Sequence, residues 1–180
     1  MSGLILNRVG ETVPELIGHL VYLSAWMVAA GKSFEDYRLS SEFATTKLAS
    51  ILVSDPLATG ALRVDFRSAD PDYRARIRAA LAADVGDDSW AAASHLLTPD
   101  APAGPTVEPV SITAERWGRL SRTYITCTAD EAVPLAAQRR FIEEADQLTP
   151  DNLTCVRPLA SSHSPFLSQP EQLSDILRHL

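Results

Sequence analysis

The sequence predicts an α/β fold in which three parallel strands with flanking helices form the core and a mostly helical segment is inserted between the first two strands. Three short apolar runs are rich in strand formers: 20–25, 122–128 and 153–158. Helical patterns alternate with these runs, whereas the stretch between the first and second run holds short helical pieces separated by turns and no buried strand. The expected division is a partial core of 1–27 and 110–180 and a helical cap of 28–109.

The chain begins with a helix and a strand. The segment 4–13 spaces its apolar residues as an amphipathic helix does, and Pro14 follows it. The run HLVYLSAW, from His19 to Trp26, is short and apolar, which is typical of a strand buried on both faces. The first strand is therefore expected directly after the first helix.

Helix signals dominate the middle of the chain. The clearest helix is 70–85, because Asp70 is a suitable N-cap and Pro71 suits the first helical position. A second helical pattern covers 87–97. The stretch 98–109 is rich in proline and glycine, which indicates a linker back to the core.

The second half of the chain regains an alternation of strands and helices. The runs RTYITCT at 122–128 and LTCVRPL at 153–159 predict strands, and the segments 135–146 and 169–180 predict helices. This alternation implies a parallel sheet with right-handed crossovers. The expected inner side of the helix at 135–146 holds Ala136, Phe141, Ile142 and Ala145.

Composition and charge exclude several classes of protein. The 180 residues are 46% hydrophobic and 22% charged, and the net charge of −7 disfavours nucleic acid and anionic membranes as partners. No apolar run reaches the roughly 20 residues of a membrane span, and the N-terminus does not resemble a signal peptide. Cys127 and Cys155 both fall in expected strands, so we expect reduced core thiols in a cytoplasmic protein. The four histidines are scattered, so no metal site and no cofactor are expected.

One acidic and one basic residue follow neighbouring strands of the expected sheet. Asp130 comes just after the strand at 122–128, and His163 comes just after the strand at 153–159. Functional side chains gather at the carboxyl ends of parallel strands, where an aspartate can fix the tautomer of an imidazole and stabilise its protonated form. We therefore expect Asp130 and His163 to form an acid–base pair.

Each of these residues also has a purely structural interpretation. An aspartate after a strand often caps a turn, and a histidine in a loop is often an exposed surface residue. Glu131 adjoins Asp130 and is an alternative for the acid. Asp130 is preferred because it lies closer to the end of the strand.

The sequence resembles a known family at three places: LVYLSAWM, RWGRLSRTYITCTADEAVP and SSHSPFLSQPEQL. These segments resemble the α/β-hydrolase branch that contains plant methyl-salicylate esterases, hydroxynitrile lyases and many bacterial esterases. The resemblance covers nearly the whole chain, with 28–109 in the place of the family's cap. It implies that Asp130 is the acid and His163 the base of a Ser-His-Asp triad.

The resemblance places the nucleophile outside this chain. MSG at the N-terminus is similar to the last residues of a G-H-S-M-S-G nucleophile turn, which puts the serine directly before Met1. In a complete turn, the backbone N–H of Met1 would form half of the oxyanion hole. Ser2 is a poor substitute, because the motif then requires glycine where Leu4 stands. The chain is therefore expected to be the C-terminal two thirds of a hydrolase.

Apolar residues near or within the cap are expected to line a substrate pocket. The candidates are Trp26, Phe66, Trp90, Leu96 and Leu97. For each of them, ordinary core packing is the alternative. The residue after His163 is Ser164, whereas the resembling hydroxynitrile lyases carry a lysine there, so the esterase-like members match better.

Two functions are expected from these observations. The first is hydrolysis of a small carboxylic ester by a Ser-His-Asp mechanism, with no cofactor. The alternative is a non-catalytic hydrolase-like remnant or interaction module. The 180 residues alone are expected to be inactive, and the strand near 20–25 is expected to be a bare sheet edge that favours a homodimer or aggregation.

Overall fold

The core of the molecule is a three-stranded parallel sheet. The computed structural model describes residues 2–180, and the sheet consists of β1 (Leu20–Leu23), β4 (Arg122–Cys127) and β5 (Cys155–Leu159) in the order β1-β4-β5. Both pairings are parallel, with Leu23 opposite Ile125 and Cys127 opposite Leu159. The three predicted strands and their parallel arrangement are confirmed.

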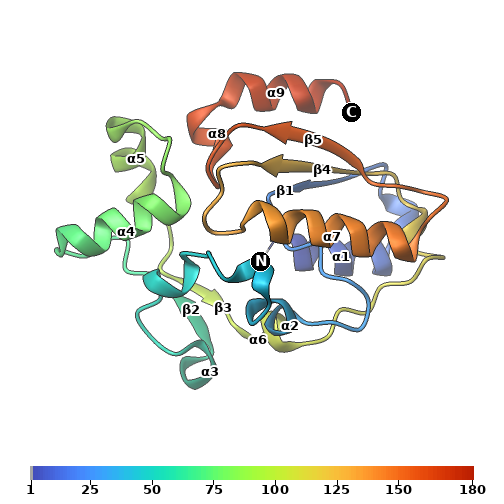
Figure 1. Cartoon of the computed structure of the whole chain (residues 1–180), viewed down its shortest axis with the longest axis horizontal. Coiled ribbons are helices and arrows are strands. Elements are labelled where there is room, and N and C mark those ends of the chain that lie inside the picture. The colour runs from blue at the N-terminus through green and yellow to red at the C-terminus, as the bar shows by residue number, and fades with distance from the viewer. Residues whose placement is uncertain (1) are drawn as a thin grey trace.

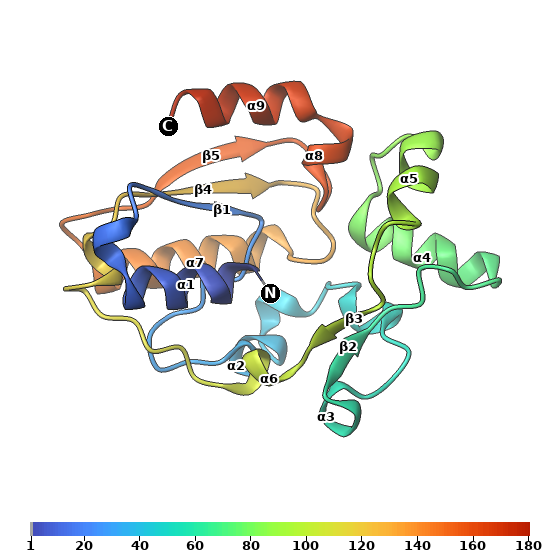
Figure 2. The ribbon, with the colours of Figure 1, turned by 180° about the vertical axis from the view of Figure 1, so that it is seen from behind.

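Helices cover both faces of this sheet, as Figures 1 and 2 show. On one face, α1 (Ser2–Thr12) and α7 (Leu135–Leu148) pack on a cluster that includes Leu20, Tyr22 and Tyr124. On the other face, α9 (Pro170–Arg178) packs on a smaller cluster. That second cluster contains Ile125, Leu159 and Leu173. Cover on both faces agrees with the apolar sequence of β1, LVYL, and with the complete burial of β4.

The chain between β1 and β4 folds into short helices and one small two-stranded sheet. The helices are α2 (Phe34–Arg38), α3 (Pro56–Thr59), α4 (Pro71–Leu81), α5 (Asp87–Ser94) and α6 (Gly104–Val107). The strands β2 (Ala61–Arg63) and β3 (Asp100–Pro102) pair in antiparallel orientation. The remaining helices are short: 3₁₀ turns at Pro14–Leu16, Ser41–Phe43, Leu48–Ile51 and Trp117–Arg119, and α8 (Pro165–Ser168).

The pair β2–β3 was not expected from the sequence. Each strand has only three residues and none of them is buried, so neither leaves an apolar run. The pair is closed by a surface ion pair between Arg63 and Asp100, with 2.6 Å between Nε and Oδ1. Long-range partners of this kind are invisible to local periodicity.

The part of the segment 28–109 that contains α4, α5, β2 and β3 lies on the side toward which the arrowheads of β4 and β5 point in Figures 1 and 2, whereas α2 and α6 lie below α1 and α7 in both views. Part of it has its own apolar cluster, formed by Ile51, Tyr73, Ile77 and Ala80. Other side chains of the segment, Phe34, Tyr37 and Phe43, belong to the main core beside Phe141. The segment therefore packs continuously onto the sheet, and its treatment as a separate cap stays a prediction.

The expected inner side of α7 needs one correction. Phe141, Ile142 and Ala145 are buried as expected, but Ala136 is exposed. Gln138 is buried in its place, because its side-chain amide donates to Cys127 O and Val133 O and accepts from Cys127 N. A polar residue is tolerated there because its hydrogen bonds are satisfied.

The two cysteines differ in their environment. Cys127 is buried at the end of β4, and burial raises the pKa of its thiol to about 11. Cys155 begins β5 and is exposed, so the expectation of two core thiols is wrong for Cys155. β5 is the outer strand of the sheet and most of its residues are exposed, which its apolar sequence does not indicate.

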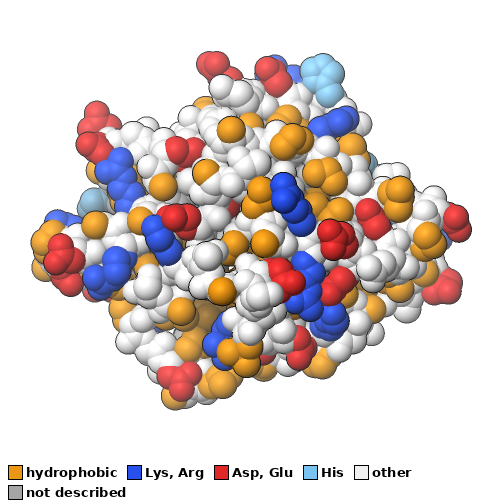
Figure 3. Space-filling model, in the orientation of Figure 1, with side chains coloured by type: hydrophobic (Ala, Val, Ile, Leu, Met, Phe, Trp, Pro, Cys, Tyr) orange, Lys and Arg blue, Asp and Glu red, His pale blue; other side chains and the backbone are white. Residues whose placement is uncertain are grey.

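The surface and the helices carry two further general features. Within residues 2–180, no helix is both long and apolar enough to span a membrane, and no three potential metal-binding side chains of His, Cys, Asp or Glu are grouped. Acidic and basic side chains are interspersed over the face seen in Figure 3.

Candidate active site

Asp130 is held rigidly at the carboxyl end of β4. The strand ends at Cys127, and the chain turns so that Oδ1 of Asp130 accepts hydrogen bonds from the backbone N–H groups of Ala132, at 2.7 Å, and Val133, at 2.9 Å. The side chain has no exposed surface. Its second oxygen, Oδ2, points away from this turn toward the next loop of the sheet edge.

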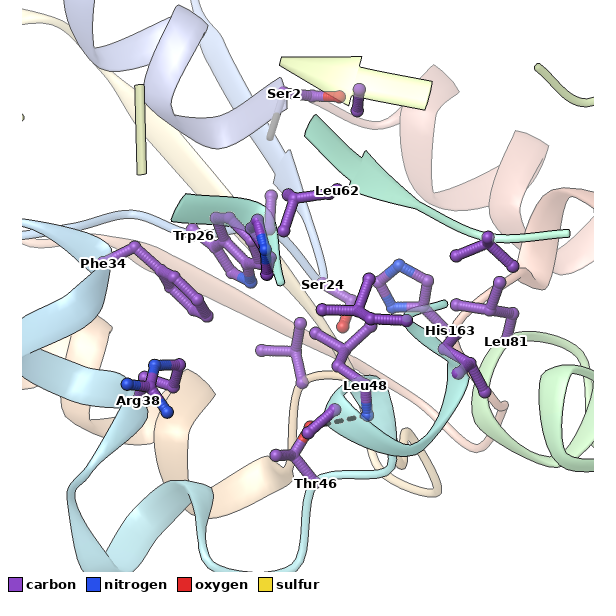
Figure 4. A pocket seen from close by; sticks show the side chains of 18 of the residues that line it. Ser2, Ser24, Trp26, Phe34, Arg38, Thr46, Leu48, Leu62, Leu81 and His163 are labelled. Carbon is purple, nitrogen blue, oxygen red and sulfur yellow. Dashed lines mark hydrogen bonds between the residues drawn. The ribbon is translucent and has the colours of Figure 1, made fainter. Parts of the chain in front are cut away.

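His163 lies in that next loop, between β5 and α8. Its Nδ1 is 2.7 Å from Oδ2 of Asp130. A carboxylate only accepts hydrogen bonds, so Nδ1 carries the proton, and Nε2 is the nitrogen that remains for chemistry. The imidazole is about one third exposed and forms part of the wall of a cavity, as Figure 4 shows.

Glu131, the alternative acid, does not contact the histidine. Its carboxylate forms an ion pair with the ammonium group of Lys47. The backbone around it is also tied to the inserted segment: Lys47 N donates to Glu131 O at 2.7 Å, and the hydroxyl of Thr46 donates to Ala132 O at 2.8 Å. The geometry therefore pairs His163 with Asp130 and gives Glu131 an anchoring contact.

Ser24 also contacts Asp130, and the sequence did not indicate this contact. Its hydroxyl donates a hydrogen bond to Oδ2 of Asp130, the same oxygen that faces His163. It follows the last residue of β1, is buried, and has a backbone φ of 39°. A non-glycine residue at positive φ is uncommon and is held there by its surroundings. The register of β1 against β4, which places Leu23 opposite Ile125, would have been the only signal for this contact.

A large cavity opens beside the imidazole. Its volume is about 910 Å³, and it lies between the sheet edge and the inserted segment. Trp26 and Phe34 stack in its wall, with ring centroids 3.7 Å apart. Other apolar side chains complete the wall; those labelled in Figure 4 are Leu48, Leu62 and Leu81.

The structure separates the five pocket candidates into two groups. Trp26 and Phe66 line the cavity. Trp90, Leu96 and Leu97 do not line it: Trp90 packs against the apolar cluster of Ile51 and Tyr73, and Leu96 is 85% exposed. The wall residues that sequence reasoning missed come from short helices and loops, where apolar residues follow no regular period.

The position predicted for the nucleophile, directly before Met1, lies outside the described residues, so that prediction is not tested by them. Met1 lies outside the described residues, and so does the oxyanion role expected for its backbone N–H. Ser2 lines the cavity at some distance from the imidazole in Figure 4. Among the described residues, no Ser, Thr or Cys side chain forms a hydrogen bond with Nε2 of His163.

Comparison with known proteins identifies the family. A model of the alpha/beta hydrolase family matches residues 2–176, which is nearly the whole chain. The chain belongs to the alpha/beta hydrolase family. Within it, the chain is similar to the proteins named methylesterase 13 and methylesterase 14 of Arabidopsis thaliana. Identity is 28% over 179 residues for the first and 36% over 76 residues for the second.

Solved structures show the same fold. A pyrethroid hydrolase from Sphingobium faniae JZ-2 aligns with a TM-score of 0.78 at 23% identity, and polyneuridine aldehyde esterase aligns with a TM-score of 0.66 at 21% identity. Both alignments cover 98% of this chain but only 66% and 67% of the other chains. Against methylesterase 13 the chain covers 38% of the relative's length. The chain thus spans about two thirds of these two solved structures and less than half of methylesterase 13.

Proposed function

We propose that this chain carries the acid and the base of a carboxylic ester hydrolase of the Ser-His-Asp type. The observation that carries the proposal is the pair of Asp130 and His163, with Nδ1 bonded to a buried carboxylate and the imidazole at the wall of an apolar cavity. The esterase-type relatives support the same class of reaction.

The proposed reaction has two halves. In the first, Nε2 of His163 takes the proton of a serine hydroxyl as its oxygen attacks the ester carbonyl, and then gives that proton to the departing alcohol, which leaves an acyl-enzyme. In the second, the imidazole takes a proton from water as the water oxygen attacks the acyl carbonyl. The imidazolium then returns that proton to the serine oxygen, which leaves as the acid is released. Asp130 fixes the tautomer and stabilises the imidazolium in both halves.

The proposal needs a nucleophile, and two candidates differ in their support. The resemblance of MSG to the end of a nucleophile turn favours a serine directly before Met1, in a longer form of the protein. The length of the solved relatives agrees with a longer protein. Ser2 is the alternative within the chain, because it lines the cavity.

The cavity favours an apolar ester as substrate. Its wall is built mainly from aromatic and branched aliphatic side chains, including the stacked pair of Trp26 and Phe34. Transfer of apolar groups, from either the acid or the alcohol part of an ester, out of water and onto such a wall lowers the free energy of the complex. A small carboxylic ester is therefore the proposed substrate class.

Hydrolysis of a chromogenic short-chain ester tests the proposal. The 180-residue chain and a longer gene product that includes the preceding residues are compared. We expect activity from the longer protein, a loss of about 10⁴-fold in kcat for Asp130→Asn, and at least as large a loss for His163→Ala. His179→Ala is the matched control, because that exposed histidine bonds only to the backbone of its own helix.

The outcomes separate the candidate nucleophiles and the alternative function. Activity of the 180-residue chain that disappears in Ser2→Ala would assign the nucleophile to Ser2. Activity of the longer protein that survives His163→Ala would overturn the proposal. Absence of hydrolysis in both forms would favour a non-catalytic hydrolase-like module.

Cytoplasmic location and pairing of two copies through the edge of β1 stay predictions.

A further inference from the structure

The loop that carries His163 is held from outside by an aspartate of the inserted segment. Asp84 lies in the turn between α4 and α5. Its Oδ2 accepts the backbone N–H of Ser162 at 3.0 Å, and its Oδ1 accepts the hydroxyl of Ser162. Ser162 directly precedes His163 and is only 2% exposed. Both polar hydrogens of this residue thus have their partner on Asp84.

The residue that follows His163 is tied to the same place. The hydroxyl of Ser164 donates to the backbone oxygen of Leu81, the last residue of α4, at 2.7 Å. Ser164 is therefore bonded to the last residue of α4, and Ser162 to the turn that follows this helix. The backbone on each side of the imidazole is fixed by these contacts.

The anchoring end of α4 is itself well supported. The helix buries Tyr73, Ile77 and Ala80, and the hydroxyl of Tyr73 donates to Ile51 O at 2.5 Å. Arg78 closes the turn beyond the helix by donating from Nη2 to Val85 O at 2.7 Å. Asp84 itself is exposed, but the turn that carries it follows directly on this packed helix end, which gives its carboxylate a supported position.

The side chain of His163 has few restraints of its own. Among the described residues, its ring bonds only to Oδ2 of Asp130, so the direction of Nε2 depends on where the backbone at 162–164 lies. Burial raises the pKa of Asp84, but its hydrogen bonds, of which those from Ser162 have the largest effect, together outweigh burial and hold that pKa below its ordinary value. The ionised form of Asp84 is thus the one that the loop stabilises.

We propose that Asp84 is a positioning residue that orients His163 toward the cavity by fixing both polar hydrogens of Ser162. The proposal rests on the function proposed above for His163. It assigns to the segment 28–109 a role in aligning the base in addition to its contribution to the cavity wall.

The test uses the longer, ester-hydrolysing protein with Asp84→Ala and Asp84→Asn. A displacement of the base by about 1 Å costs on the order of 10²-fold, so we expect kcat to fall about 10- to 100-fold in Asp84→Ala while KM changes little. Asparagine keeps one acceptor oxygen, so Asp84→Asn should retain more activity than alanine. Asp88→Asn is the control, because that carboxylate of α5 is exposed and forms no hydrogen bond or ion pair with the histidine loop or with Arg78 among the described residues.

A second readout does not depend on hydrolysis. The Nδ1 proton of His163 gives a downfield proton NMR signal while it is bonded to Asp130, and we expect Asp84→Ala to broaden or remove that signal in folded protein. Ser162→Ala, which keeps the backbone N–H, should give a smaller loss of kcat. Adding Ser162→Ala to Asp84→Ala should lower kcat little further, because the hydroxyl bond that Ser162→Ala removes is already lost in Asp84→Ala.

The results decide the proposal in each case. A folded Asp84→Ala variant with wild-type kcat and an unchanged Nδ1 signal would overturn it. If Asp84→Ala does not fold, Asp84→Asn and Ser162→Ala carry the same comparison, and wild-type kcat in both would overturn it. Failure of the proposed function is distinguishable, because hydrolysis would then be insensitive to His163→Ala while the Nδ1 signal still reports the position of the ring.

Discussion

Asp130 is a meeting point of hydrogen bonds from three separate parts of the chain. Oδ1 receives two backbone N–H groups of its own turn, and Oδ2 faces both His163 and the hydroxyl of Ser24. A buried carboxylate needs such compensation, because removing it from water without partners is costly. Ser24 is therefore part of what keeps Asp130 in place.

Two substitutions at Ser24 distinguish the contribution of its hydroxyl to stability from the cost of its backbone conformation. Ser24→Ala removes a hydrogen bond to a charged group, and we expect the free energy of unfolding to fall by about 1.5–3 kcal/mol. Ser24→Gly also removes the hydroxyl but suits the φ of 39° better, so it should be less destabilising by about 1 kcal/mol. Urea denaturation of the three proteins measures both differences; an alanine variant as stable as wild type would show that the hydroxyl contributes nothing.

At this scale, the sequence reveals residues whose chemistry and strand position both point to a role. Asp130 and His163 are predictable because each follows an apolar run at the same sheet edge. Ser24 and Asp84 are not, because they act on residues 106 and 78 positions away along the chain, and serine and aspartate have many ordinary places. Only the folded backbone shows which of them face the pair.

Among the elements, α1 packs tightly against the chain that leaves β1. A Cβ atom added at Gly3 would lie 2.4 Å from the backbone oxygen of Trp26, which is closer than side-chain carbons come to backbone atoms. The glycine thus allows the first turn of α1 to lie against the chain that leaves β1. The ring of Trp26 is in the cavity wall, so this contact also locates part of that wall.

Gly3→Ala tests this contact through the sign of its effect. In an open helix the change stabilises by up to about 1 kcal/mol, whereas here we expect destabilisation of about 1–3 kcal/mol, because the backbone of Trp26 must move. Thermal and urea unfolding measure the difference. Gly18→Ala is the control, since an added Cβ there meets nothing within 4 Å. Stabilisation by Gly3→Ala would mean that α1 does not pack so closely.

The sequence predicts elements according to how much of them is buried. β1 is apolar and β4 is buried throughout because the helices cover both faces of the sheet, and the periodicity of α7 follows its contact with the same core. The three-residue strands β2 and β3 have no such burial and were missed. The exposed position of Ala136 is not predictable from local periodicity, because a polar residue, Gln138, lies on the buried side of α7. The side-chain amide of Gln138 is hydrogen-bonded there.

On the scale of the whole molecule, a polar cluster joins the inserted segment to the core helix α7. Glu144 of α7 accepts hydrogen bonds from Lys32 at 2.6 Å, from Arg140 at 3.0 Å, and from the hydroxyl of Tyr37. Burial raises the pKa of Glu144, but these three bonds outweigh it, and the pKa lies below its ordinary value of 4.5. Ionised Glu144 therefore stabilises the folded state.

The cluster predicts a dependence of stability on acid. A carboxyl group whose pKa is lowered by folding contributes its stability above pH 4.5, and this contribution is lost as the pH falls through the lower, folded-state pKa. We expect Glu144→Gln to be less stable at neutral pH and to lose less stability than wild type as the pH falls below 4.5. Urea midpoints between pH 7 and pH 3 measure this, with the exposed neighbour Glu143→Gln as control. Parallel pH curves for wild type and Glu144→Gln would contradict the prediction.

The bonds beside Asp130 and His163 also bear on how this protein can be re-engineered. Thr46 and Lys47 hold the backbone after Asp130, and the end of α4 holds the backbone around His163. An exchange of the whole inserted segment for that of a relative with different specificity would therefore replace the supports of the acid and the base together with the pocket. The two-stranded sheet of β2 and β3, together with α3, makes none of these four contacts. Residues there can therefore be exchanged without removing the supports of Asp130 and His163.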